Sequence, residues 1–280
     1  MKKNQSTLFY KIHGAGNDCL VFHSRGLSEE LQRNTAAKKQ WIKTFSHRHL
    51  GLGSDQILEI LSLKPLAIQI WNCDGSKAEM CGNGARAFAS LALQEGWISS
   101  TDDELPLQIS GKQYSLKKVA HGFALSLGAP LVSEERLLKL QKHRIPFTAV
   151  DVGNPHAVVF MAGARSWKAP NDFTFREYGV RIERHTALPQ KTNVEFVRKI
   201  VRGAASVKLF VEVWERGAGA TLSCGSGAVA VAAAYCARSK KPASRYDIVM
   251  NDYVLSVRFE RGSAYLSGPS EIVAQGEYFY

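Results

Sequence analysis

The sequence predicts a mixed α/β protein made of two related halves. Two segments with the same plan carry this prediction: "WNCDGSKAEMCGNGARAFA", which starts at Trp71, and "WERGAGATLSCGSGAVAVA", which starts at Trp214. In each segment a Cys follows the Trp by ten positions and opens a Cys-Gly-x-Gly-Ala motif. A second similar pair, "HGAGNDCLVF" at 13–22 and "DVGNPHAVVF" at 151–160, precedes the Cys motifs in the same order. Two such pairs in one order indicate duplication of a single α/β unit.

Alternation of apolar and polar residues predicts the strands, because successive side chains of a strand point to opposite faces. The expected strands are 65–72, 107–119, 123–127 and 206–215. An Ala-rich run follows each repeated Cys and predicts a helix there. Gly96 suits the end of the first of these helices. Each half is therefore expected to mix strands with a helix that starts at its Cys motif.

An amphipathic helix is expected near the N-terminus, within "AAKKQWIKTFSHRH" at 36–49. The apolar residues of this run recur at helical spacing, so Trp41, Ile42 and Phe45 should face inward. The basic residues would then cover the solvent side.

The boundary between the halves is placed near residue 125. The first half is then 1–125, joined by the C-terminal strand within 270–280, and the second half is 126–269. The run "LVSEERLLKLQKHRIP" at 131–146, close to this boundary, is interpreted as a linker helix or an excursion.

Composition excludes several classes of protein. The 280 residues, 45% of them hydrophobic, suffice for a substantial core. No apolar run approaches the roughly 20 residues that span a bilayer, and the N-terminus lacks the apolar stretch of a secretory signal, so no membrane partner is expected. Five cysteines, an odd count, argue against a disulfide framework and favour the cytoplasm. The formal charge of +11 is interpreted as a solvated basic surface, with no nucleic-acid partner.

The repeated cysteines each stand at a Gly-rich turn from strand to helix. Backbone N–H groups and the helix dipole favour an anion there, so such a turn can hold a carboxylate and favour thiolate over thiol. If two thiols approach one carbon from opposite sides, one can remove a proton while the other delivers one, and the stereocentre inverts. If each Cys is taken by itself, the alternative interpretation is that it is a small buried apolar residue with no chemical role. A phosphate-binding role for the glycines is an alternative, although neither motif carries the Lys-Ser/Thr pair of a phosphate-binding loop. The cysteines lack the closely paired spacing of a zinc site, and no metal or cofactor is expected.

The motifs resemble those of the diaminopimelate epimerases, which are amino-acid epimerases independent of pyridoxal phosphate. The matching stretches are "HGAGND", "RHLGLGSDQ", "NCDGSKAEMCGNGAR", "GNPH", "TNVEF" and "ERGAGATLSCGSGA", in the order of the family. The resemblance implies two pseudo-symmetric domains, each a mixed, mostly antiparallel sheet wrapped around a central helix, with the active site in the cleft between them. It implies interconversion of LL- and meso-diaminopimelate, without a cofactor, for lysine and peptidoglycan precursors.

The resemblance also implies the site residues. Cys81 and Cys224 become the acid–base pair, and His156 and Glu215 would tune or position the thiols. The backbone of Gly82-Asn83 and of Gly225-Ser226 becomes the cradle for the substrate carboxylate. The implied substrate ligands are Asn17, Gln56, Asn72, Asn154, Asn193, Glu215 and Arg216.

Two positions depart from the family pattern. Cys19 stands where the family more often has Phe and is interpreted as a packing thiol. Ala274 stands where members of the family carry a Tyr at the dimer contact, which weakens the homodimer that the resemblance implies. Cys73 is assigned to a loop, and Cys236 lies twelve residues after Cys224 on the same expected helix.

Three other functions compete with this interpretation. A related two-thiol racemase would act on proline or hydroxyproline, but Asn72, Asn154, Asn193 and Arg216 would have little to bind in such a small ring. A non-catalytic binding protein could keep the cleft, although both thiols are retained here. A basic nucleic-acid-binding protein would bind DNA in a salt-dependent way.

Overall fold

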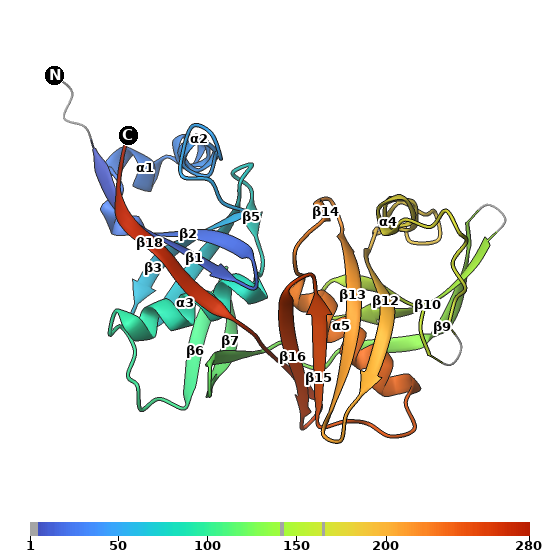
Figure 1. Ribbon diagram of the computed structural model, residues 1–280. Coiled ribbons are helices and arrows are strands. Elements are labelled where there is room, and N and C mark those ends of the chain that lie inside the picture. The colour runs from blue at the N-terminus through green and yellow to red at the C-terminus, as the bar shows by residue number, and fades with distance from the viewer. Residues whose placement is uncertain (1–4, 141–142, 164–165) are drawn as a thin grey trace. The chain divides into compact units, whose positions relative to one another are not determined.

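The computed structural model describes residues 5–140, 143–163 and 166–280 (Figure 1). Contacts divide the chain into two units. Unit 1 consists of Met1–Leu125 and Gly268–Tyr280, and unit 2 is Ser126–Ser267.

Unit 1 is a mixed sheet with helices on its faces. Along the sheet the strands follow the order β18-β1-β2-β3-β4-β6-β7-β8, and β5 pairs with the free part of β4. The pairs β2–β3 and β4–β6 are parallel, and the other neighbours are antiparallel. The elements are β1 (Ser6–Gly14), β2 (Asn17–His23), η1 (Ser24–Gly26), α1 (Glu29–Arg33), α2 (Thr35–Phe45), β3 (Gln56–Leu63), β4 (Leu66–Asn72), β5 (Lys77–Ala78), α3 (Gly82–Gln94), β6 (Glu104–Ile109), β7 (Lys112–Val119), β8 (Gly122–Ser126) and β18 (Ser270–Phe279).

Unit 2 repeats this arrangement. Its strands follow the order β9-β10-β11-β12-β13-β15-β16-β17, with β14 on β13, and the parallel pairs are again the third and the fifth, β11–β12 and β13–β15. The elements are β9 (Leu131–Leu140), β10 (His143–Asp151), β11 (Pro155–Phe160), α4 (Phe175–Glu183), β12 (Asn193–Arg202), β13 (Ser206–Glu215), β14 (Gly219–Ala220), α5 (Gly225–Arg238), β15 (Arg245–Met250), β16 (Tyr253–Glu260) and β17 (Ser263–Ser267).

The shared order and direction of the strands confirm the duplication that the sequence indicated. In unit 1 the register pairs Cys19 with Gln56, and in unit 2 it pairs His156 with Asn193. Equivalent positions of the two units can therefore be compared one by one.

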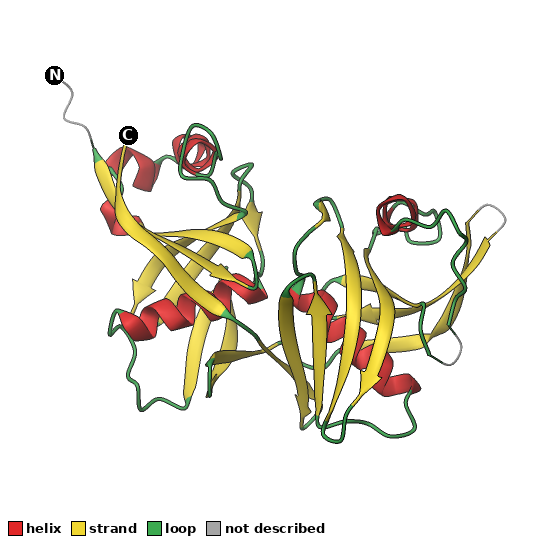
Figure 2. Cartoon of the chain, viewed as in Figure 1, coloured by secondary structure: helices red, strands yellow, loops and turns green. Residues whose placement is uncertain are grey.

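In each unit the sheet, yellow in Figure 2, curves around one helix, shown in red. These helices are α3 and α5, and their Ala-rich sequences let the strands approach closely because small side chains take little room. Every residue of α5 from Gly227 to Tyr235 is buried. The fold is thus the mixed sheet around a central helix that the resemblance implied. No helix in the described residues has the length and apolar character needed to cross a membrane.

The opposite face of the unit 1 sheet is covered by α2. Asn34 caps this helix by accepting hydrogen bonds from the N–H groups of Ala36 and Ala37. Trp41, Ile42 and Phe45 are buried, as the amphipathic pattern predicted, and the rings of Trp41 and Phe45 stack with their centroids 4.5 Å apart. The helix ends at Phe45, four residues before the end of the segment considered.

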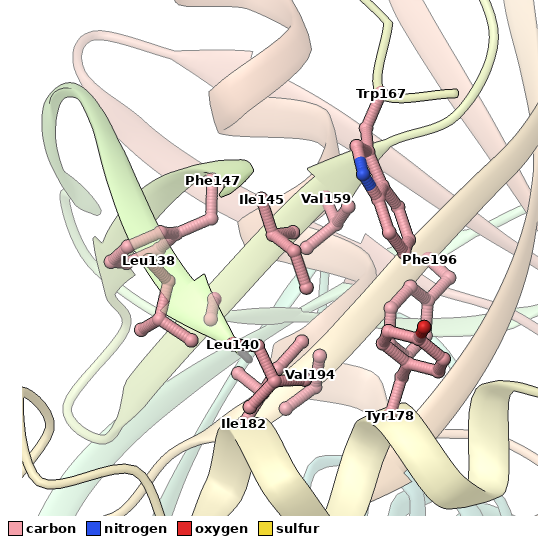
Figure 3. Packing of buried hydrophobic residues seen from close by; sticks show 11 residues of the cluster. Leu138, Leu140, Ile145, Phe147, Val159, Trp167, Tyr178, Ile182, Val194 and Phe196 are labelled. Carbon is pink, nitrogen blue, oxygen red and sulfur yellow. The ribbon is translucent and has the colours of Figure 1, made fainter. Parts of the chain in front are cut away.

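Of the two alternatives for the segment 131–146, the linker helix was wrong for the residues that the structure describes. The segment forms β9 and the start of β10, which pair in an antiparallel ladder, while residues 141–142 lie outside the described residues. Leu138 and Leu140 alternate inward from β9, and they join Ile145 and Phe147 in the core cluster of unit 2 (Figure 3). The exposed Glu, Lys and Arg residues of β9 are good helix formers, but sheet pairing and burial of the alternate leucines outweigh that preference.

One close contact fixes β1 against α3. A Cβ added at Gly14 would lie 2.4 Å from the carbonyl oxygen of Asn83, in the first turn of the helix. Only glycine allows the two backbones to approach so closely. The contact sets where α3 begins relative to the strands.

We expect Gly14→Ala to destabilise the protein by about 1–3 kcal/mol, because the new methyl group must displace backbone that cannot yield cheaply. Urea unfolding would measure this loss. Gly276→Ala is the matched control on β18, since its Cβ would meet only the end of the Phe9 ring, at 3.1 Å. A Gly14→Ala protein as stable as the control would contradict the close packing.

Candidate active site

Cys81 is the N-cap residue of α3. Its backbone is extended (φ −141°, ψ 103°), and its Sγ accepts a hydrogen bond from the N–H of Gly84 at 3.2 Å. A Cβ at Gly84 would lie 3.1 Å from the sulfur atoms of both Cys81 and Cys19. The second glycine of the motif therefore makes room for two sulfur atoms at the start of the helix.

Polar side chains gather at one end of the inner strands β2, β3 and β4, and Asn17 among them contacts Cys81. Asn17 lies at the start of β2, and its Oδ1 accepts from the Cys81 thiol at 3.4 Å. Gln56, at the start of β3, stands opposite both Cys19 and Asn72 in the register. The Oε1 atom of Gln56 is buried and has no hydrogen-bond partner in the described residues. Unit 1 thus brings together its predicted residues, including Gly82 and Asn83 in the first turn of α3.

Cys224 occupies the equivalent place in unit 2. It is the N-cap of α5 with an extended backbone (φ −127°, ψ 115°), and its Sγ accepts from the N–H of Gly227 at 3.3 Å. Ser226 Oγ lies 3.6 Å from the same sulfur, and Gly225 begins the helix. The two repeated motifs therefore fold the same way, each with a thiol capping a buried helix.

A chain of hydrogen bonds joins His156 to this turn. Nδ1 of His156 lies 2.7 Å from Oε1 of Glu195, and Nε2 lies 3.0 Å from Oδ1 of Asn154. Asn154 in turn donates from Nδ2 to Ser226 Oγ at 3.4 Å. His156 is buried and approaches the capping turn through Asn154 and Ser226.

Glu195 is a site residue that sequence reasoning missed. It is completely buried, and a Cβ at Gly227 would lie 2.7 Å from its Oε1, so its carboxylate reaches the start of α5. The available signal was a single acidic residue inside the otherwise apolar strand run "VEFV". A carboxylate in such a run is rarely buried without a polar partner.

Glu215 and Arg216 lie where β13 ends. Oε1 of Glu215 accepts from Thr221 Oγ1 at 2.5 Å, and burial raises the pKa of Glu215 although hydrogen bonds from Thr221 and Cys224 oppose the rise. Arg216 donates its backbone N–H to Oδ1 of Asn193 at 2.9 Å, and its Nη1 to the carbonyl of Gln190 at 3.1 Å. Unit 2 thus brings Asn154, His156, Glu215 and Ser226 to the Cys224 turn, whereas Arg216 and Asn193 contact each other where β13 ends.

The environment of Cys224 favours the thiol, contrary to the expectation that the helix start would favour the thiolate. Burial raises its pKa well above the usual range, and the carboxylates of Glu215 and Glu195 raise it further. The hydrogen bonds from Ser226 and Gly227 oppose this rise but do not outweigh it. Desolvation and two negative neighbours therefore exceed the effect of the helix N-terminus at this thiol.

The remaining cysteines are not in disulfides, since all five thiols of the chain are free. Cys19 is fully buried, as a packing thiol would be, but it also lies beside the site: its thiol points to Oδ1 of Asn17 at 3.8 Å. Its hydrogen bond with Cys81 and its burial raise the pKa of Cys19 well above the usual range. Cys73 lies in the loop after β4, where its thiol donates to the carbonyl of Ser54 at 2.8 Å. Cys236 lies in the last turns of α5.

The Trp that opens each repeated segment is anchored by a buried carboxylate. Trp71 Nε1 donates to Glu59 at 2.9 Å, and Trp214 Nε1 donates to Glu183 at 2.8 Å. Each anchor holds the strand end from which the chain runs to its capping Cys.

No group of three His, Cys, Asp or Glu side chains in the described ranges is arranged to hold a metal ion.

An ion network next to Asn17 supports the unit 1 site. Asp18 lies 2.6 Å from Lys11 Nζ and 3.1 Å from Arg48 Nη2, and Arg48 also reaches Asp55 at 2.6 Å. Burial alone would raise the pKa of Asp18, but hydrogen bonds from Lys11 and Arg48 outweigh burial and lower the pKa to about 2.

We expect Asp18→Asn to lower the free energy of unfolding at pH 7 by about 1 kcal/mol, allowing for solvent screening. The folded-state pKa lies below that of an unfolded Asp, so the stabilisation is present above about pH 4 and is lost as the pH falls toward 2. Urea unfolding at pH 7 and pH 3 would measure this: the difference in free energy of unfolding between the unchanged protein and Asp18→Asn should be smaller at pH 3. Asp252→Asn, in the exposed turn between β15 and β16, is the control; a difference independent of pH would contradict the ion network.

Comparisons with known proteins agree with this geometry. The model of the family "Diaminopimelate epimerase" matches residues 9–113 and 148–272. Diaminopimelate epimerase of Carboxydothermus hydrogenoformans is 32% identical over 290 residues, which cover 97% of this chain and 99% of that relative. The relative of the same name from Desulforudis audaxviator is also 32% identical, over 96% of this chain and 98% of its own length.

Solved structures of lower identity share the fold. A PhzF-family phenazine biosynthesis protein of Bacillus anthracis has a TM-score of 0.72 at 11% identity and covers 98% of this chain and 99% of its own. A hydroxyproline epimerase from Agrobacterium vitis has a TM-score of 0.68 at 15% identity and covers 100% of this chain and 94% of its own. The family match and the relatives confirm the resemblance that the sequence motifs indicated, and the chain belongs to the diaminopimelate epimerase family.

Proposed function

We propose that this chain is a diaminopimelate epimerase, an isomerase that interconverts LL- and meso-2,6-diaminopimelate by proton transfer at Cα, for lysine and peptidoglycan precursor synthesis. One observation carries the proposal: two units of the same topology each present a thiol at the N-cap of a buried helix. The family match and the full-length relatives support the substrate.

In the proposed reaction the thiols of Cys81 and Cys224 act on opposite faces of one substrate carbon. One thiolate accepts the proton that leaves Cα, and the other thiol gives its proton to the opposite face, so the charge of the pair is unchanged. The negative charge that develops on the substrate is stabilised by backbone N–H groups at the two helix starts, Gly82-Asn83 and Gly225-Ser226. The reverse reaction exchanges the roles of the thiols.

Diaminopimelate has an ammonium and a carboxylate at each end, and we assign the distal end to polar residues of both units. The guanidinium of Arg216 can hold the distal carboxylate through two parallel hydrogen bonds. The amides of Asn72, Asn154 and Asn193 can donate or accept there as the substrate requires. Asn17, which contacts the Cys81 thiol, and Gln56 are assigned to the substrate without a place at the distal end. Glu215 can accept from an ammonium group, while His156 and Glu195 position the turn that holds Cys224.

Hydroxyproline and proline are the alternative substrates. One structural relative is a hydroxyproline epimerase with bound trans-4-hydroxy-L-proline, and it supports this alternative through the fold alone, since the identity is 15%. A small ring with one carboxylate has no second carboxylate for Arg216 to hold, so the charge-assisted hydrogen bonds of that group would not form. Diaminopimelate is the better match for Arg216.

We propose that the enzyme works in the cytoplasm, because its two helix-capping thiols must stay reduced to exchange protons.

We also propose that the enzyme forms the homodimer that the resemblance implies. Ala274, where family members carry Tyr, lies on β18 opposite Lys11. Light scattering would decide the assembly state: a mass twice that of the chain supports the dimer, and the mass of one chain contradicts it.

We expect Cys81→Ala and Cys224→Ala each to lower epimerisation at least about 10³-fold, because every turnover needs both an acid and a base. The measurement is NMR of LL-diaminopimelate in D₂O under reducing conditions, without pyridoxal phosphate. In the unchanged enzyme, deuterium should enter the meso product earlier than the remaining substrate, since one thiol removes the proton and the other supplies deuterium.

Cys236→Ala is the matched control, because Cys236 lies on the same helix as Cys224 but at the other end. It should keep the activity of the unchanged enzyme. Activity within tenfold of normal in either capping-thiol variant would remove the two-base mechanism. Exchange with proline but not with diaminopimelate would establish the alternative.

We expect Arg216→Met to raise KM for diaminopimelate about 10- to 100-fold, because a charge-assisted hydrogen bond to the distal carboxylate is worth about 1.5–3 kcal/mol. Steady-state kinetics would measure the change. Arg198→Met, which removes an exposed cation paired with Glu212 on the same unit, is the control. An unchanged KM in Arg216→Met would refute its assignment to the distal carboxylate.

A further inference from the structure

Arg86 is a buried cation beside the Cys81 half-site that the proposed mechanism does not use. It is 0% exposed and is the one charged residue in α3. Nη1 donates to the carbonyl of Gly268 at 2.6 Å, and Nη2 donates to Oδ1 of Asn83 at 2.7 Å. Its Nε is buried without an acceptor in the described residues. Its hydrogen-bond acceptors are therefore neutral oxygens.

A buried cation is costly unless an anion compensates it. Burial lowers the pKa of Arg86 to about 10, so the guanidinium still carries its charge at neutral pH. In the part of the chain that the structure describes, no carboxylate forms an ion pair with it. The group that interacts electrostatically with Arg86 is Cys81, and that interaction favours the charged guanidinium.

The other charged groups near α3 form ion pairs with one another. On the strands that pack against the helix, Lys11 pairs with Asp18 at 2.6 Å, and Nε2 of His13 lies 3.6 Å from Glu271. Asp18 also pairs with Arg48, which reaches Asp55. The titratable groups around Cys81 and the start of α3 are Lys11, His13, Asp18, Cys19, Arg48, Asp55, Arg86 and Glu271.

Arg86 lies five positions after Cys81 on the same helix, and it holds Asn83 in the turn that Cys81 caps. If a thiolate at Cys81 stabilises the guanidinium, the guanidinium stabilises the thiolate equally, because the interaction is mutual. Asn17 is compatible with this state, since its amide can offer either its oxygen to a thiol or its NH₂ to a thiolate.

The equivalent position in unit 2 is Val229, five residues after Cys224, and it carries no charge. Cys224 has the carboxylates of Glu215 and Glu195 as neighbours instead. The same Cys-Gly-x-Gly-Ala turn is therefore placed next to a cation in one unit and next to anions in the other.

We propose that Arg86 is a positioning residue that keeps Cys81 as the thiolate in the free enzyme, so that Cys81 is the resting base and Cys224 the resting acid. The inference rests on the proposed function and deepens it. The stereoisomer whose Cα–H faces Cys81 reacts with this form: it loses its Cα proton to Cys81 and receives one from Cys224. The enzyme then holds a Cys81 thiol and a Cys224 thiolate, and one proton must pass from Cys81 to Cys224, through solvent, before the resting form returns.

The test is the pH dependence of alkylation of each thiol in the full chain without substrate. The protein is treated briefly with iodoacetamide between pH 5 and pH 10, and modified peptides containing Cys81 and Cys224 are quantified by mass spectrometry. Each curve is scaled to its own plateau, which removes differences in access. We expect the midpoint for Cys81 to lie at least about one pH unit below that for Cys224, because an adjacent opposite charge favours an ionised form by about one to three units.

Three variants sharpen the test. Arg86→Met should move the Cys81 midpoint upward by about one to three pH units and leave the Cys224 midpoint unchanged. Arg86→Lys keeps the positive charge and should hold the Cys81 midpoint close to that of the unchanged protein. If Arg86 had only a structural role, lysine would not lower the midpoint relative to Arg86→Met. Val229→Ala, at the equivalent place in α5, should move neither midpoint.

Two results would overturn the proposal: equal or reversed midpoints in the unchanged protein, or a folded Arg86→Met protein whose Cys81 midpoint does not move. If Arg86→Met fails to fold, the order of the midpoints in the unchanged protein and the Arg86→Lys profile still decide the question. Alkylation does not depend on turnover. A low Cys81 midpoint without diaminopimelate epimerisation would reject the proposed function alone, and epimerisation with equal midpoints would reject only the role of Arg86.

Discussion

The cap that each thiol forms on its helix is the contact on which both half-sites depend. The sulfur atoms of Cys81 and Cys224 accept backbone N–H groups three residues later, at 3.2 Å and 3.3 Å. This holds each thiol at the positive end of a buried helix dipole. Glycine at the donor position leaves room for the sulfur, since a Cβ there would lie only 3.1 Å from the sulfur of Cys81 or 3.3 Å from that of Cys224. The same backbone geometry therefore caps the helix, orients the thiol and lets the strands pack closely.

Duplication supplies this geometry twice, and side-chain divergence makes the two copies chemically different. At equivalent positions, Cys19 of unit 1 corresponds to His156 of unit 2, and Leu58 corresponds to Glu195. A two-base inversion needs one thiolate and one thiol at the same moment. Two identical environments would give both thiols the same affinity for a proton, so an enzyme of this kind gains from unequal surroundings.

Most strands and helices with a regular pattern were predictable, but the run 107–119 forms two strands, β6 and β7, and the charged edge strand was not predicted. The alternation within 206–215 predicts β13, and the apolar spacing around Trp41 predicts α2, because both patterns follow from local geometry. The segment 131–146 misled because its charged residues favour a helix, while pairing with β10 decides its state. In the site, the duplicated motif identified the thiols, but Glu195 and Arg86 were missed because each is a single charge within an apolar run.

The sequence by itself determined that two equivalent turns each present a Cys, since the spacing of Trp, Cys and Gly is written twice in the chain. It also determined the family, because the motifs occur in the family's order. Only the tertiary structure decided the electrical environment of each thiol. The carboxylate of Glu195 reaches the start of α5 from β12, and Arg86 is fully buried by the surrounding fold. Burial and distance set how strongly a charge acts, and neither quantity can be read from positions along a chain.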